Sequence, residues 1–267
     1  MSVSVAFEKA RAENRAALVG YLPAGFPTVD GGIAALRTVV DAGADVIEVG
    51  FPYTDPMMDG PVIQRASEIA LAGGVRAADV LRTVAAVAAT GVPTVIMLYW
   101  NLVERYGVDR FARDLASAGG AGLITPDLIP DEAGEWIAAS DAHGLDRVFL
   151  VAPSSTDARI ASTVAACRGF VYASAVMGVT GAREKTSDAA PVLVDRVRAA
   201  AGPLPIGVGI GVRDGAQAAS VGAYADGVIV GSALVRCLLD APDLDSGLTA
   251  LRSLTTDLAA GVRASAR

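Results

Sequence analysis

The chain has 267 residues, of which 52% are hydrophobic and 19% are charged, so it can bury a substantial core and long disordered segments are not expected. Its formal net charge is −7, which argues against nucleic acid or an anionic membrane as the main partner. A phosphorylated metabolite stays possible, because backbone N–H groups at a helix start bind phosphate without a basic patch.

The first 20 residues predict an N-terminal helix rather than a signal peptide. Charged residues interrupt this segment, so it has no apolar central region. No apolar run in the chain reaches the roughly 20 residues that a membrane span needs. The two cysteines, Cys167 and Cys237, lack CxxC spacing and are expected to be reduced residues of the core. Together these features predict a cytoplasmic protein.

Eight short apolar runs, rich in β-branched residues and bounded by Gly, Pro or Asp, predict strands. Most do not alternate with polar residues, which is typical of strands buried on both faces of a parallel sheet. In chain order the runs are Leu18–Leu22, Val46–Val49, Thr94–Leu98, Gly122–Ile124, Arg147–Val151, Phe170–Ala173, Pro205–Gly209 and Gly227–Val230.

Amphipathic, Ala-rich segments between these runs predict helices. They are Val29–Ala42, Ala77–Ala89, Val108–Ala118, Asp131–His143, Asp157–Ala166, Ala189–Ala200 and Arg213–Val221. The alternation predicts the α/β class, as a single-domain (β/α)₈ TIM barrel spanning residues 1–267, because no linker divides the chain. An open, doubly wound sheet is the alternative. The connections Gly50–Arg76 and Ser174–Asp188, after strands two and six, are long and are expected to lie over the active face.

The richest segment for chemistry runs from Asp45 to Gln64, across the end of the second strand. Glu48 lies inside the apolar strand near its carboxyl end, where desolvation would raise its pKa toward the operating pH of a general acid/base. A structural salt bridge is the alternative for this residue. Asp55 and Asp59 follow in a loop where Asp-Pro and Asp-Gly pairs also serve as ordinary turn chemistry.

Three glycine-rich pieces follow strands six, seven and eight. They are Met177–Gly181, Gly207–Gly211 and Val230–Ser232. Barrel enzymes commonly bind phosphate after strands seven and eight, where glycine lets the backbone approach the anion. Ser232 could donate to a phosphate oxygen, cap its helix, or do both. The pieces together predict a phosphate site.

The segment DVIEVGFPYTDPMMDGPVIQ, residues 45–64, resembles the tryptophan synthase α-subunit family, in which Glu, Asp-Pro and Asp-Gly-Pro recur at this spacing. The segments YASAVMGVTGA, PIGVGIG and GVIVGSALV resemble the same family, and the match extends from about residue 7 to about 240. Met57, Met58 and Trp100 depart from it, because smaller residues or Leu are expected at these positions. The departures would reshape the indole pocket or the rim that faces a partner.

The resemblance implies a function and a set of site residues. It implies a carbon–carbon lyase of tryptophan biosynthesis that cleaves indole-3-glycerol phosphate to indole and glyceraldehyde 3-phosphate. Glu48 would be the general acid/base, and Asp59 would bind the indole N–H and stabilise positive charge on the ring. The implied substrate-binding residues are Tyr21, Tyr172, Thr180, Gly181, Gly209, Gly231 and Ser232. The loop 178–188 would be a lid; an ordinary connection is the alternative.

The residue inventory fits this chemistry. A Schiff-base aldolase needs a lysine at a strand end, but Lys9 falls in the predicted N-terminal helix and Lys185 in a loop. The chain has one histidine, His143, at a predicted helix end, so no metal site is expected. The substrate itself must therefore accept the electrons of the breaking bond, which indole does once its C3 is protonated.

The resemblance also implies a tryptophan synthase β subunit as partner in an α₂β₂ heterotetramer. Pyridoxal phosphate is expected only in that subunit, and no cofactor is expected in this chain. The docking surface would include Pro52–Gly60 and Asn101–Tyr106. Two other readings stay open from the sequence. One is a phosphate-binding isomerase, which would have no use for the Glu48/Asp59 pair, and the other is a non-catalytic activating subunit.

Overall fold

A computed structural model of the chain describes residues 2–174 and 189–265. Eight parallel strands form a closed barrel in which each strand pairs with its neighbours in the sequence and β8 pairs with β1. The strands are β1 (Ala17–Pro23), β2 (Val46–Gly50), β3 (Thr94–Met97), β4 (Gly122–Thr125), β5 (Asp146–Val151), β6 (Val171–Ser174), β7 (Ile206–Gly209) and β8 (Gly227–Val230). The predicted (β/α)₈ barrel is confirmed, and the open sheet is excluded.

Each strand lies within one or two residues of its predicted position. Every residue of β1, β2, β4 and β8 is buried, because one face of each strand fills the barrel and the other packs against helices. This double burial explains why the runs are continuously apolar.

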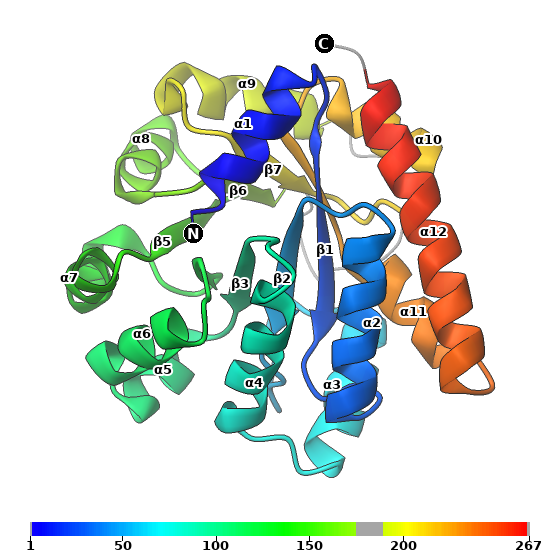
Figure 1. Cartoon of the computed structure of the whole chain (residues 1–267). Coiled ribbons are helices and arrows are strands. Elements are labelled where there is room, and N and C mark those ends of the chain that lie inside the picture. The colour runs from blue at the N-terminus through cyan, green and yellow to red at the C-terminus, as the bar shows by residue number, and fades with distance from the viewer. Residues whose placement is uncertain (1, 175–188, 266–267) are drawn as a thin grey trace.

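The helices form a ring around the barrel (Figure 1). They are α1 (Ser4–Ala12), α2 (Val29–Asp41), α3 (Pro61–Ala72), α4 (Ala77–Ala88), α5 (Trp100–Tyr106), α6 (Val108–Ser117), α7 (Gly134–His143), α8 (Asp157–Ala166), α9 (Ala189–Ala201), α10 (Gly215–Gly222), α11 (Ser232–Leu239) and α12 (Leu244–Ala264). No helix of the described residues is long and apolar enough to cross a membrane.

The predicted helix Asp131–His143 is wrong at its start. A short 3-10 turn, Pro130–Glu132, comes first, and α7 begins only at Gly134. The predicted long connection Gly50–Arg76 is also shorter than expected, because Pro61 opens α3 at the first helical position, where its missing N–H costs nothing. The irregular part of this connection is residues 51–60, together with the turn before α4.

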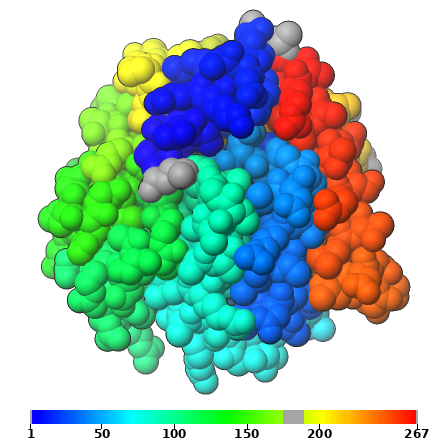
Figure 2. Space-filling view, viewed as in Figure 1, coloured from blue at the N-terminus to red at the C-terminus, as the bar shows by residue number. Residues whose placement is uncertain are grey.

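The N-terminal helix closes the end of the barrel where the strands begin. Phe7 of α1 packs against Phe170, with ring centroids 5.2 Å apart. The Asp146 carboxylate, at the start of β5, accepts a hydrogen bond of 2.7 Å from the backbone N–H of Val3. Figure 1 shows α1 across this end, and Figure 2 shows its blue surface covering it. Ligand access is therefore left to the opposite end, where the strands finish.

The two cysteines are free thiols, as expected, but both are half-buried rather than core residues. Burial raises the pKa of the Cys167 thiol to about 12, so this group stays protonated at neutral pH.

Candidate active site

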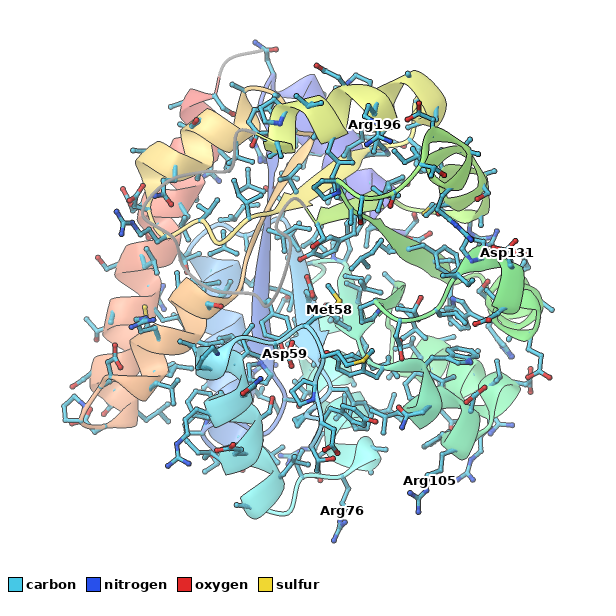
Figure 3. All side chains as sticks on the ribbon, turned by 180° about the vertical axis from the view of Figure 1, so that it is seen from behind. Met58, Asp59, Arg76, Arg105, Asp131 and Arg196 are labelled. Atoms are coloured by element: carbon cyan, nitrogen blue, oxygen red, sulfur yellow. The ribbon has the colours of Figure 1, made fainter. Side chains whose placement is uncertain are left out.

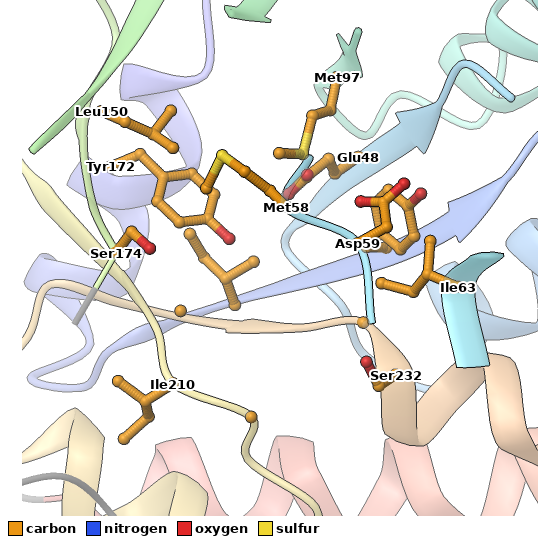
Figure 4. Close-up of a pocket in the computed structure, with 15 residues that line it drawn as sticks. Glu48, Met58, Asp59, Ile63, Met97, Leu150, Tyr172, Ser174, Ile210 and Ser232 are labelled. Carbon is orange, nitrogen blue, oxygen red and sulfur yellow. The ribbon is translucent and has the colours of Figure 1, made fainter. Parts of the chain in front are cut away.

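A pocket opens at the carboxyl ends of the strands. Figure 3 shows Met58 and Asp59 near the centre of this end, and Figure 4 shows the pocket itself. It is lined by Tyr21, Glu48, Met58, Asp59, Ile63, Met97, Leu150, Tyr172, Ser174, Gly209, Ile210, Gly211, Ile229, Gly231 and Ser232. The pocket brings together every predicted site residue within the described part of the chain. Thr180, Gly181 and the loop 178–188 lie outside the described residues.

Glu48 is the third residue of β2 and its side chain is only 1% exposed. Within the described part of the chain, its Oε2 atom has no hydrogen-bond partner. Burial, together with the charge of Asp59, raises the pKa of Glu48 to about 8. A structural ion pair would lower this pKa, so the salt-bridge alternative is not supported. At neutral pH the Glu48 carboxyl is mostly protonated and can donate a proton.

Asp59 lies on the irregular segment between β2 and α3, one residue before Gly60, which precedes the first turn of α3. The residue is half-buried, and burial raises its pKa to about 6. Near pH 7 Asp59 is therefore mostly ionised while Glu48 is mostly protonated. Two carboxyl groups whose pKa values are separated in this way can divide the roles of acid and anion.

The raised pKa of Glu48 has a measurable effect on stability. The native state keeps the Glu48 proton up to about pH 8, whereas an unfolded chain releases it near the ordinary glutamate pKa of 4.5. The free energy of unfolding therefore falls as pH rises through this window. Glu48→Gln removes this loss of stability, because the amide does not ionise, and we expect it to raise the free energy of unfolding by about 4 kcal/mol at pH 8.

At pH 5 the same substitution should give a much smaller gain. Urea unfolding of both proteins at pH 5 and pH 8 measures the difference, and Glu68→Gln on the exposed face of α3 serves as the control. An equal effect of Glu48→Gln at the two pH values would contradict a buried, protonated Glu48.

Two tyrosines line the pocket, and each ring leaves no room for a side chain at a neighbouring glycine. Tyr21 pairs in register with Glu48, and a Cβ at Gly50 would overlap the Tyr21 ring. A Cβ at Gly209 would lie 2.5 Å from the Tyr172 hydroxyl oxygen. Burial raises the pKa of both tyrosines well above the ordinary value, so both hydroxyls stay neutral donors. Gly209 is thus required to make room for Tyr172, whatever its role toward a ligand.

The other end of the pocket is formed by backbone at the start of α11. Ser232 is the first residue of this helix, and Gly231 precedes it without a side-chain cap, so the capping role considered for Ser232 is wrong. The first intrahelical bond runs from the Val235 N–H to the Gly231 carbonyl, at 3.0 Å. The N–H groups before Val235 have no place in the helical ladder, which suits an anion. Figure 4 shows Ser232 and Ile210 on the side away from Met97 and Leu150.

Part of the pocket wall was not predicted from the sequence. These residues are mainly apolar and come from strands or from α3, namely Ile63, Met97, Leu150, Ser174 and Ile229. A position at or just beyond the end of a predicted barrel strand was the available signal for most of them.

The remaining candidates lie outside the pocket. Asp55 is exposed and accepts a hydrogen bond from Thr54, so its turn interpretation is supported. Met57 is 72% exposed. Trp100 packs toward Trp136, with centroids 6.5 Å apart, so of the three departures from the family pattern only Met58 reaches the pocket. The part of the chain that the structure describes contains no cluster of three or more His, Cys, Asp or Glu able to hold a metal ion.

The comparisons with known proteins identify the family of the chain. The family model described as "Tryptophan synthase alpha chain" matches residues 7–263. A tryptophan synthase alpha chain of Salinispora arenicola is 72% identical over 98% of this chain and 97% of the relative, and that of Mycobacterium marinum is 63% identical over 96% and 93%. The solved structure of Mycobacterium tuberculosis tryptophan synthase superposes with a TM-score of 0.92, at 60% identity and 98% coverage of both chains. The chain therefore belongs to the tryptophan synthase alpha chain family, the lyases that cleave indole-3-glycerol phosphate in tryptophan biosynthesis.

Proposed function

We propose that Glu48 is the general acid/base of this lyase reaction and that Asp59 is the anion that stabilises the indole ring. The observation that supports this assignment is one pocket with a buried and a half-buried carboxyl group, whose pKa values burial raises to about 8 and about 6. Among the described residues, no Lys or Arg lines the pocket to neutralise them. Burying charges without partners is costly, and such sites are retained for chemistry.

In the proposed reaction, protonated Glu48 donates its proton to C3 of the indole. The ring then carries a positive charge, which the Asp59 carboxylate stabilises beside the indole N–H. A carboxylate of the pair takes the proton of the glycerol hydroxyl next to the breaking bond. The C–C bond breaks as the aldehyde forms, and its electron pair returns to the ring. The proton count balances, because one proton enters at C3 and one leaves the hydroxyl.

The substrate would lie across the pocket with its indole at one end and its phosphate at the other. Tyr21, Tyr172 and the apolar side chains of Met97 and Leu150 would enclose the indole, and the phosphate would lie at the start of α11. We assign the phosphate contacts to backbone and hydroxyl groups because they need no basic patch. The described residues of this end are Gly209, Gly231 and Ser232. We carry the substrate-binding roles of Thr180 and Gly181, which lie outside the described residues, over from the family resemblance alone.

We further propose that the chain works with a tryptophan synthase β subunit, in an α₂β₂ heterotetramer, and that pyridoxal phosphate is bound by that subunit alone. The docking surface would be the rim formed by Pro52–Gly60 and Asn101–Tyr106. Two exposed apolar side chains near this rim, Met57 at 72% and Ile129 at 39%, support it. We place the reaction in the cytoplasm, a reducing compartment that suits two free thiols.

The experiment that tests the proposal measures indole released from indole-3-glycerol phosphate by the purified chain, with and without the β subunit. Release by the chain alone, increased when the partner is added, is the expected result. Release only in the presence of the partner, and retained in a Glu48→Gln variant, would instead make the chain an activating subunit without chemistry of its own.

A further inference from the structure

The segment that carries Asp59 has no helix or strand of its own. Residues 51–60 are irregular, so the place of the Asp59 side chain depends on individual contacts to this backbone. Two side chains make such contacts beside Asp59. The Tyr99 hydroxyl accepts a hydrogen bond of 3.0 Å from the backbone N–H of Met58, and the Gln64 side-chain amide donates one of 2.8 Å to the Asp59 carbonyl.

Tyr99 is itself held firmly. It lies just after β3, directly before α5, and its side chain is only 7% exposed. The next residue, Trp100, donates its backbone N–H to both carboxylate oxygens of Asp127, at 2.9 and 3.0 Å. The Tyr99 ring packs against Tyr53, with centroids 4.8 Å apart. The Tyr99 hydroxyl is therefore fixed in place, and it bonds to the backbone of residues 51–60, which form no helix or strand.

Tyr99 does not belong to the pocket lining, so it would act through another residue rather than on substrate. Its hydroxyl group accepts from the backbone N–H of Met58, the residue before Asp59. If that N–H loses its acceptor, the Met57–Met58 peptide unit is freed to rotate, and the Asp59 carboxylate one residue on can turn toward water. A carboxylate that gains water loses the desolvation that raises its pKa.

We propose that Tyr99 is a positioning residue for the cleavage reaction, whose hydroxyl holds the Met58–Asp59 backbone so that the Asp59 carboxylate stays inside the pocket. This inference rests on the role proposed for Asp59. It predicts that the Tyr99 hydroxyl controls both the rate and the pH at which Asp59 ionises. A ring that only fills space would control neither.

The test is Tyr99→Phe, which removes one oxygen atom and leaves the ring packing intact. In the full-length chain we expect kcat to fall by about tenfold, because loss of the acceptor misplaces a catalytic group. The acid limb of kcat/KM, set by Asp59 near pH 6, should move to lower pH as Asp59 becomes better solvated. Gln64→Leu, which removes the other contact, should move the same limb in the same direction.

Tyr224→Phe is the matched control, because it removes the hydroxyl of a tyrosine just after α10, away from the pocket and from the proposed docking surface. It should keep the parental kcat and pH profile. Thermal unfolding of each variant checks the fold. A parental acid limb in Tyr99→Phe would overturn the proposal, even if kcat fell. Asp59→Asn in the same assay separates the role of Asp59 from that of Tyr99. Parental activity of Asp59→Asn would reject the role of Asp59. Low activity of Asp59→Asn together with parental activity and pH profile of Tyr99→Phe would reject only the role of Tyr99.

Discussion

Glu48→Gln is expected to lower kcat for indole release by at least about 10²–10⁴-fold, the usual contribution of one well-placed general acid/base. Glutamine has nearly the same shape as protonated glutamic acid but has no acidic proton to give to C3. Glu48 is buried in a pocket that the substitution does not enlarge, so substrate should still bind. The measurement is kcat and KM from steady-state indole release, together with the binding of unreacted substrate.

Glu68→Gln on the outer face of α3 makes the same chemical change at an exposed site and should leave both constants unchanged. A variant at position 48 that turned over at near-parental rate would remove Glu48 from the reaction. A loss of binding with normal kcat would assign it to recognition instead.

Asp59→Asn is expected to impair the reaction strongly, though less than Glu48→Gln. The amide can still accept a hydrogen bond from the indole N–H but carries no negative charge to stabilise the cationic ring. Removing one such electrostatic group typically costs about 10²–10³ in kcat. Steady-state kinetics in the same assay give the ratio of the two effects, and an Asp59→Asn variant more damaged than Glu48→Gln would reverse the proposed division of roles.

The pH profile adds an independent criterion. In the parent, kcat/KM should rise with pH as Asp59 ionises near 6 and fall as Glu48 ionises near 8, with both limbs belonging to the coupled pair. Asp59→Asn removes the acid limb. It also removes the negative charge that helps to raise the pKa of Glu48, so the falling limb should move to lower pH. A falling limb that stayed in place would mean that the two carboxyl groups do not interact.

The barrel and the candidate residue Glu48 were both predictable from local sequence. Strands buried on two faces are apolar throughout, so the eight runs stand out without any knowledge of neighbours. Glu48 is conspicuous because a carboxylate interrupts one of these runs, and Asp59 lies only eleven residues away in a turn-rich segment. The two residues of the proposed reaction are close in sequence, and both are carboxylic acids, which suit acid/base chemistry.

Other features depend on contacts between distant segments. The helix α12 was not predicted, because Gly247 and Gly261 weaken its local propensity. The fold requires at least the second of these, since a Cβ at Gly261 would overlap the backbone of Gly215 in α10. Close packing of α12 against α10 outweighs the low helix propensity of these glycines, and this packing cannot be predicted from a sequence pattern.

The sequence by itself determined the order of the strands and singled out Glu48, because burial on both faces and a carboxylate within an apolar run are local properties. The roles proposed for Glu48 and Asp59 came from the family resemblance. Only the tertiary structure decided which side chains surround that pair, how far each pKa moves, and that Tyr99 meets the backbone at Met58, 41 residues earlier. The physical reason is closure of the barrel. Pairing β8 with β1 brings eight strand ends into one ring, and desolvation depends on everything within that ring.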